Sequence, residues 1–216
     1  MSRTKRVVIA VLAGCALTPT PDTVTPAPVT FSVHRNSQAT FRTDAPLETV
    51  VGTTVGSGTV TGSVTVDPAK PAEATGTIRV DLSTLKTGIA NRDAHMVGPD
   101  WLDVQDEINR YAVFVVTGVE IGGPLEPGRE VPAKVKGTLT VKRRPIDVVA
   151  DARITYLRLS GPEAEAPRRS GFGPEILRVR TRLQTRFTDH GMQVPQFYFL
   201  RVSNEIQLEV DLILTR

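Results

Sequence analysis

Few residues in this sequence have the type and spacing that catalysis requires. Asp93 and His95 could act in acid–base chemistry, but no nucleophile elbow, phosphate-binding loop or paired metal ligand accompanies them. We therefore expect these two side chains to make hydrogen bonds that hold a helix against strand ends. The histidines His34, His95 and His190 lie far apart and share no metal-binding spacing, so we expect neither a metal site nor a catalytic site.

Cys15 has a more specific context. The chain opens with a basic stretch and an apolar run over residues 7–12, which is the order of a secretory signal and too short to span a bilayer. The segment Leu12-Ala13-Gly14-Cys15 follows directly and resembles the lipobox of bacterial lipoproteins at each position. The resemblance implies that residues 1–14 are removed as a signal peptide and that Cys15 carries the lipid. An ordinary cysteine behind an ordinary secretory signal is the alternative.

A linker separates this cysteine from the rest of the chain. Residues 15–28 contain four prolines and no apolar period, which predicts an extended, semi-rigid spacer. Two or more acyl chains would hold the protein on a membrane essentially permanently. Ala16 resembles the residue found after the cysteine in lipoproteins that are released to the outer membrane. We therefore expect a lipid-anchored protein of the bacterial cell envelope, on the periplasmic side of the outer membrane if the host has one.

The charge balance argues against a nucleic-acid partner. The chain has 26 Lys and Arg against 23 Asp and Glu, but three of the basic residues lie in residues 1–14, which hold no acidic residue. Without that segment 23 residues of each sign remain, so the mature protein has a formal net charge of zero and no general attraction for phosphate backbones. The single cysteine also excludes an internal disulfide framework.

From residue 29 onward the dominant hydrophobic period is two, as expected for strands with one buried face. The run over residues 131–142, for example, alternates valine, alanine and leucine with lysine and threonine. No alternation of strands with helices is present, which argues against a doubly wound parallel sheet. Many strands with one-sided alternation predict an antiparallel barrel or a sandwich.

Two late segments carry complementary charge. Residues 177–187 place arginines on one face, and residues 205–214 place glutamates and an aspartate on one face. If the two strands are antiparallel neighbours, we expect Arg180 or Arg182 to lie near Glu205 or Glu209, which would fix the strand register. Binding of an anion by the arginines is the less favoured alternative.

One segment departs from period two. Residues 88–98 contain good helix formers without alternation and end at Gly98, which predicts a short helix followed by a turn that carries Trp101 and Leu102. In a small barrel such a helix commonly closes one end.

The same region resembles a known family. Thr87-Gly88 is followed by Arg92-Asp93-Ala94-His95-Met96 and then by Trp101-Leu102-Asp103, and the strand segments at residues 60–67 and 135–142 agree in order and spacing. This pattern is similar to that of the YceI-like family, which comprises lipocalin-like bacterial proteins that bind polyisoprenoid lipids. The resemblance implies an all-β fold over residues 29–216, an antiparallel eight-stranded lipocalin-like barrel with one short helix. The loop over residues 160–174 is longer than is usual in the family.

The resemblance also implies an apolar ligand, a lipid of the polyisoprenoid or isoprenoid quinone type, held in the barrel cavity by a carrier or buffer that needs no other cofactor. Because residues 111–116 are apolar on both faces, the alternation leaves open which side Phe114 takes. The alternative is a non-catalytic structural or interaction module of the envelope with a fully packed interior. The side chains that we expect to contact the ligand are Trp101, Phe114, Leu139, Leu183, Phe187, Leu208, Val210 and Leu212.

Overall fold

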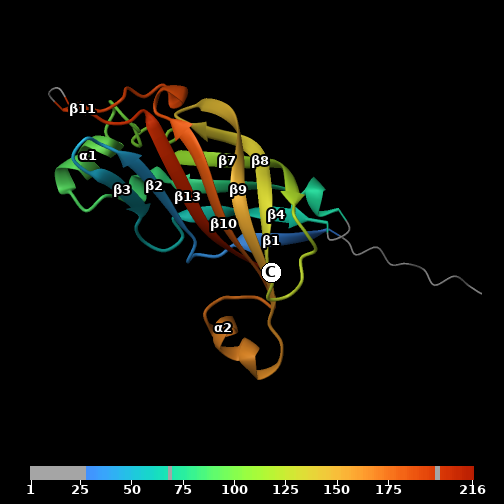
Figure 1. Ribbon diagram of the computed structural model, residues 1–216. Coiled ribbons are helices and arrows are strands. Elements are labelled where there is room, and N and C mark those ends of the chain that lie inside the picture. Colours follow the sequence, from blue (N-terminus) through green and yellow to red (C-terminus); the bar gives the residue numbers. More distant parts are fainter. Residues whose placement is uncertain (1–27, 68–69, 198–199) are drawn as a thin grey trace, which may run out of the picture.

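A computed structural model describes residues 28–67, 70–197 and 200–216 (Figure 1). Cys15, the signal segment and nearly all of the linker therefore lie outside the described residues. Within the described ranges, no helix is long and apolar enough to cross a membrane.

Antiparallel strands make up most of the described chain. The strands of the main sheet are β1 (Val29–Val33), β2 (Gln38–Asp44), β3 (Thr49–Thr54), β4 (Val60–Val66), β5 (Thr75–Asp81), β6 (Leu85–Lys86), β7 (Tyr111–Ile121), β8 (Glu130–Val141), β9 (Arg144–Arg158), β10 (Glu175–Arg186) and β13 (Glu205–Thr215). A separate small hairpin consists of β11 (Gln196–Phe197) and β12 (Leu200–Arg201). The α-helices are α1 (Ala90–Val97) and α2 (Glu165–Arg169).

Eight of these strands close into a barrel. Each strand pairs with the next in the order β1, β4, β5, β7, β8, β9, β10, β13, and β13 pairs back with β1. This confirms the predicted eight-stranded antiparallel barrel, and α1 is the predicted short helix at one end (Figure 1). Eight strands are the number that encloses either packed side chains or one small ligand.

The β13 strand has two partners on the same side. Its C-terminal end pairs with β1 through Ser32 and Val33, and its middle pairs with β2, from which β3 and β6 extend the sheet. Between these two partners the backbone amide of Ile213 donates to the Ser37 hydroxyl over 3.0 Å. Ser37 is completely buried, and its hydroxyl replaces the backbone partner that the Ile213 amide would otherwise lack where the chain passes from β1 to β2.

The two charged late segments are neighbours, as predicted. β10 and β13 are antiparallel, and the register places Arg182 opposite Glu209, with 2.9 Å between the guanidinium and the carboxylate. Arg178 binds Asp211 at 2.8 Å, whereas Arg180 reaches across β9 to Glu130 of β8. Such exposed pairs contribute only about 0.2–1 kcal/mol each, so their main effect is to oppose a one-residue slip that would bury charge.

The loop between β9 and β10 projects from the barrel and contains α2 (Figure 1). It is held by His34, whose ring stacks on Phe172 with 4.0 Å between ring centroids and donates from Nε2 to the Ser170 carbonyl over 3.1 Å. The Asn36 amide donates to the other ring nitrogen of His34. His34 is therefore a buried structural residue that fixes this long loop.

A buried carboxylate organises the barrel end next to this loop. The Glu175 side chain is 11% exposed and accepts hydrogen bonds from the Tyr156 hydroxyl at 2.7 Å, from Arg158 at 3.0 Å and from the Arg216 guanidinium. The bond from Arg216, helped by those from Tyr156 and Arg158, outweighs desolvation and lowers the pKa of Glu175 from 4.5 to about 2.

This depressed pKa predicts a specific loss of stability in acid. Because Glu175 binds protons more weakly in the folded state, its contribution is fully present above about pH 4.5 and is lost as the pH falls toward 2. We expect Glu175→Gln to lower the free energy of unfolding by roughly 2–3 kcal/mol at pH 7, with the difference from wild type vanishing near pH 2. Denaturant titrations at several pH values measure this difference. As a control, Glu126→Gln removes an exposed ion pair with Arg129 and should change the free energy of unfolding little at any of these pH values. A wild-type advantage that stays constant with pH would contradict the assignment.

Candidate functional site

The barrel encloses an elongated apolar cavity of about 190 Å³. An apolar cavity of roughly 150 Å³ is already enough to hold a small hydrocarbon. On β10 the lining runs from Leu177 to Leu183, a length of about 20 Å at roughly 3.3 Å per residue. The cavity is therefore long and narrow, a shape that suits one apolar chain.

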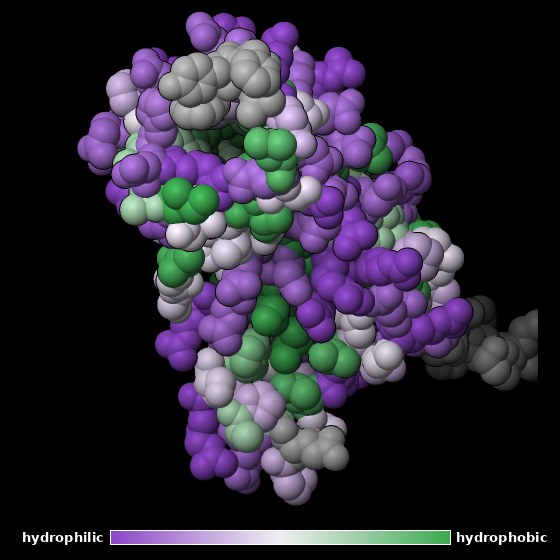
Figure 2. All heavy atoms as spheres, turned by 60° about the vertical axis from the view of Figure 1, so that its left-hand side comes forward, coloured by the Kyte–Doolittle hydropathy of each residue, from purple (hydrophilic) through white to green (hydrophobic). Residues whose placement is uncertain are grey.

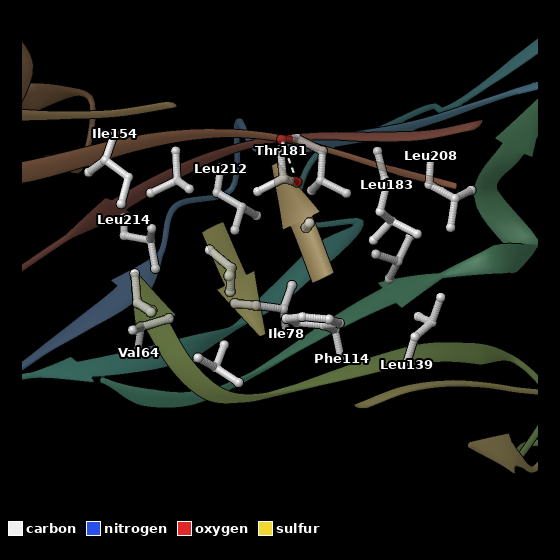
Figure 3. Close-up of a pocket in the computed structure, with 18 of the residues that line it drawn as sticks. Val64, Ile78, Phe114, Leu139, Ile154, Thr181, Leu183, Leu208, Leu212 and Leu214 are labelled. Atoms are coloured by element: carbon white, nitrogen blue, oxygen red, sulfur yellow. Dashed lines mark hydrogen bonds between the residues drawn. The ribbon is translucent and has the colours of Figure 1, made fainter. Parts of the chain in front are cut away.

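Two walls face each other across this space (Figure 3). Ile154, Thr181 and the leucines of β10 and β13 point inward from one side, and Val64, Ile78, Phe114 and Leu139 point toward them from the other. The period-two alternation of each strand aims these side chains inward while the charged residues stay outside.

The middle of the barrel is unfilled. On β10 the inward residues Leu177 and Thr185 are buried, but Val179, Thr181 and Leu183 between them are only half-buried. On β13 Leu208 and Val210 are likewise half-buried, although they point into the barrel. Inward side chains that keep accessible surface must face open space, so the interior is not fully packed.

The polar groups of the lining are already satisfied. Among the described residues that line the cavity, the polar side chains are Thr40 and Thr181. Thr181 donates to the Val210 carbonyl over 3.3 Å, and Thr40 shares a 3.0 Å hydrogen bond with the Thr53 hydroxyl. No ionisable side chain is part of this described lining. The cavity therefore offers apolar contact without a partner for a buried charge, which would be costly to enclose here.

Phe114 points into the cavity. Its ring lies over Gly137 on the neighbouring strand, where a Cβ atom would collide with it. Opposite Phe114 in the register is Leu139, which also lines the cavity. The sequence left open which face of the sheet Phe114 takes. Because Gly137 on the neighbouring strand β8 has no side chain, the inner face has room for the Phe114 ring.

The structure places six of the predicted contact residues on the cavity wall. A second group of buried side chains, next to α1, closes that end of the barrel, and it holds the remaining two. There Trp101 packs edge-on against Phe187 with 5.9 Å between ring centroids. Contrary to the prediction, neither Trp101 nor Phe187 lines the cavity. β10 ends at Arg186 and Phe187 already has helical backbone angles, so its ring turns to Trp101 at the closed end. The lining residues among those predicted are Phe114, Leu139, Leu183, Leu208, Val210 and Leu212.

Sequence reasoning missed the contribution of β2. Ala39 and Phe41 line the cavity, and the Phe41 ring lies over Gly52 of β3 as the Phe114 ring does over Gly137. The alternation of Ala39, Phe41 and Thr43 was available as a signal, but this run is short and its alanine and threonine are weakly apolar. The lining from β4 and β5 includes Val64 and Ile78, which the sequence marked only as strand residues.

Comparison with known proteins agrees with this geometry. The sequence model of the YceI-like domain matches residues 28–214. The chain belongs to the YceI-like family. No curated protein sequence was found to match it.

Solved structures show the same YceI-like barrel at low sequence identity. BcnA of Burkholderia cenocepacia has a TM-score of 0.59 and 17% identity, over 82% of this chain and 95% of that chain. A polyisoprenoid-binding domain from Saccharophagus degradans, implicated in plant cell wall breakdown, has a TM-score of 0.58 and 15% identity, over 86% and 97%. The Campylobacter jejuni YceI protein has a TM-score of 0.55 and 17% identity, over 76% and 83%. At these identities the likeness shows the fold.

The YceI-like signature segment holds the helix in place. Asp93 is buried and accepts hydrogen bonds from the Thr87 amide at 2.7 Å and from the Thr87 hydroxyl at 2.6 Å, which ties α1 to the end of β6. These bonds, with Thr87 as the dominant partner, lower the pKa of Asp93 against the effect of desolvation. The structural role expected for Asp93 is thereby confirmed, whereas His95 is exposed on α1.

The third histidine is also part of the framework. His190 is buried, and its Nε2 lies 2.8 Å from the Thr185 hydroxyl. Burial lowers the pKa of His190, more than the nearby Asp189 raises it, so the neutral imidazole is favoured. Among the described residues, no group of three His, Cys, Asp or Glu is placed to hold a metal ion.

Proposed function

We propose that this protein is an envelope lipoprotein that holds an apolar lipid, of the polyisoprenoid or isoprenoid quinone type, in its barrel cavity. The observation that carries this proposal is the long apolar cavity whose two polar side chains are hydrogen-bonded within the wall. A structural module with a packed interior would lack such a cavity. The polyisoprenoid-binding domain of similar fold supports the lipid class.

The shape and chemistry of the cavity favour the chain of the lipid over its head group. The narrow interior contacts hydrocarbon from all sides, and the rings of Phe41 and Phe114 add broad apolar surfaces. A polar head group would find no charged or unpaired polar side chain on the described lining. We therefore assign the cavity to the apolar tail and place the head group outside it.

The energetics of such binding suit a carrier or buffer. Burying about 500 Å² of apolar tail is worth roughly 12 kcal/mol relative to water, against an association cost of about 4–15 kcal/mol. A bilayer solvates the same tail about equally well. The preference for the barrel over the membrane is therefore small, which allows the lipid to be released as well as taken up.

A binding role is proposed in place of catalysis. The described cavity wall presents no ionisable side chain, and Asp93 of the signature segment is held in hydrogen bonds to Thr87. Attachment through Cys15 would keep the barrel next to the membrane that supplies the lipid. The periplasmic side of the outer membrane, in a host that has one, is the proposed location.

Transfer from vesicles tests this function. The full chain with Cys15→Ser is mixed with vesicles that contain a polyisoprenoid alcohol and is then separated from them. We expect a measurable share of the alcohol, which rises with its content in the vesicles, to leave with the protein, while a lipid with two acyl chains stays behind, because the cavity fits one narrow chain. Protein that emerges without the alcohol, or that takes both lipids equally, would argue against the proposal.

A further inference from the structure

Exposed apolar side chains lie on β3, just before and after it, and at the residue that precedes α1. Leu47 is 83% exposed, Val55 57%, Ile89 49% and Val51 48%. We refer to these four residues as the apolar strip. With the α1 side turned forward, apolar side chains interrupt an otherwise hydrophilic surface in several places (Figure 2).

The four residues belong to adjoining elements. Thr53 of β3 is paired with Lys86 of β6, and the Val55 amide donates to the Thr84 carbonyl over 2.9 Å. Arg92 of α1 binds Glu48, next to Leu47, at 2.8 Å. β3 and the start of α1 therefore lie side by side at one end of the barrel (Figure 1), and the strip follows the length of β3 from Leu47 to Val55.

The strip differs from the rest of the outer surface. Most outward positions of β10 and β13 hold arginines and acidic residues, whereas those of β3 are Thr49, Val51 and Thr53. Val115 and Val149 are also exposed, but they lie singly on strands of the barrel wall. Other strands, such as β1 and β4, also have uncharged outward positions, but these are threonines and serines. A group of exposed apolar side chains is the type of surface that meets a partner.

The strip lies on the outside of the cavity wall. β2, the neighbour of β3, supplies Ala39 and Phe41 to the cavity, and Leu85 of β6 lines it as well. An apolar molecule that reached the strip would be separated from the cavity by this part of the sheet alone.

We propose that the apolar strip docks the barrel on the surface of a lipid bilayer, so that lipid enters the cavity at the β3 and β6 side. The charges at its border do not oppose this partner. Arg42 is paired with Asp44 and Arg92 with Glu48, and Lys86 lies near the ionised Asp93, so these side chains leave no net charge that a bilayer surface would repel. The choice of lipid as cargo rests on the proposed function, whereas docking itself does not require a loaded cavity.

The chain before β1 is long enough for this orientation. β1 begins at the end of the barrel opposite α1, because Val29 pairs with Val66, whereas Val60, at the other end of β4, pairs with Val80, just before the segment that leads through β6 to α1. The 12 residues 16–27 would span about 37 Å as an extended proline-rich linker. The 12-residue strand β10 is about 40 Å long. Because strands in a barrel are tilted by about 35–45°, a strand of this length covers only about 30 Å along the barrel axis. The tether can therefore reach along the barrel and leave the far end free to meet the bilayer.

Vesicle binding of the unanchored protein tests this proposal. The full chain with Cys15→Ser is sedimented with phosphatidylcholine vesicles, with and without phosphatidylglycerol. We expect weak, reversible binding to both kinds of vesicle, and an about tenfold lower partition coefficient after Leu47→Ser and Val51→Ser. The matched control, Val115→Ser and Val149→Ser, removes two exposed side chains from the barrel wall and should bind as the parent does.

The outcomes separate docking from lipid carriage. Lipid offered in detergent micelles should load the strip variant as well as its parent, since neither Leu47 nor Val51 lines the cavity. If the strip mutations weaken vesicle binding but no protein takes up lipid, docking stands and the proposed function fails. Undiminished vesicle binding by the strip variant would overturn the docking proposal. Self-association without vesicles that the same mutations abolish would assign the strip to a second copy of the chain instead.

Discussion

Replacing Cys15 with serine is expected to move nearly all of the protein from the membrane fraction to the soluble fraction. In a lipoprotein the lipid is attached to the sulfur atom of this cysteine. Serine has a hydroxyl group of similar size that does not undergo this modification. Two or more acyl chains anchor a protein almost irreversibly, whereas the docking proposed for the apolar strip is weak and is lost on washing. The expected change is therefore close to complete.

Fractionation of cells followed by immunoblotting measures this change. Thr20→Ser, which alters the linker five residues further on and leaves Cys15 in place, should remain in the membrane fraction. A Cys15→Ser protein that still resists extraction by high salt and washing would rule out the proposed lipid anchor. It would leave the basic and apolar start of the chain as an ordinary export signal.

Substitution of Val210 by phenylalanine is expected to abolish lipid binding while the barrel remains folded. Val210 lies on the cavity wall and is half-buried because it faces open space, so a larger apolar side chain can occupy the volume that the lipid tail needs. Arginine at Leu208 or Val210 would also block the cavity, but an unpaired buried charge costs enough to threaten folding. Phenylalanine separates the two effects.

Val149→Phe provides the matched control. Val149 is 53% exposed on β9, and the next residue, Ala150, lines the cavity, so the same substitution is made on the opposite face of the wall. We expect this variant to retain the lipid, whereas the lipid content of Val210→Phe should fall at least about tenfold, since the added ring takes up space in a narrow cavity. Circular dichroism and thermal unfolding verify that both variants fold. Equal lipid content in a folded Val210→Phe protein would place the ligand elsewhere.

The sequence predicted best those features that depend on local alternation. The arginine row at residues 177–187 and the acidic row at 205–214 alternate cleanly, which predicted that Arg180 or Arg182 lies near Glu205 or Glu209, and the pairing of Arg182 with Glu209 confirms this. The eight-stranded barrel followed from the resemblance to the YceI-like family, because closure depends on pairings between distant segments such as β1 with β13.

Features set by tertiary context were harder to predict. Phe114 lies in a strand that is apolar on both faces, and its direction follows from Gly137 on the neighbouring strand. Phe187 continues the alternation of β10, but the chain turns into a helical conformation there and the ring joins Trp101 at the closed end. The branch formed by β2, β3 and β6 was not expected, because nothing in a single strand reveals that β13 accepts two partners on one side.

The central claim is that the cavity holds an apolar lipid, and the most direct measurement is mass spectrometry of the organic extract of protein purified from its native host under mild conditions. The proposal predicts one dominant polyisoprenoid or isoprenoid quinone type lipid in near-stoichiometric amount, present in wild type and Val149→Phe and absent from Val210→Phe. An extract free of any such lipid, from folded wild-type protein that also fails to take one up from vesicles, would contradict the carrier function. It would favour a structural module of the envelope.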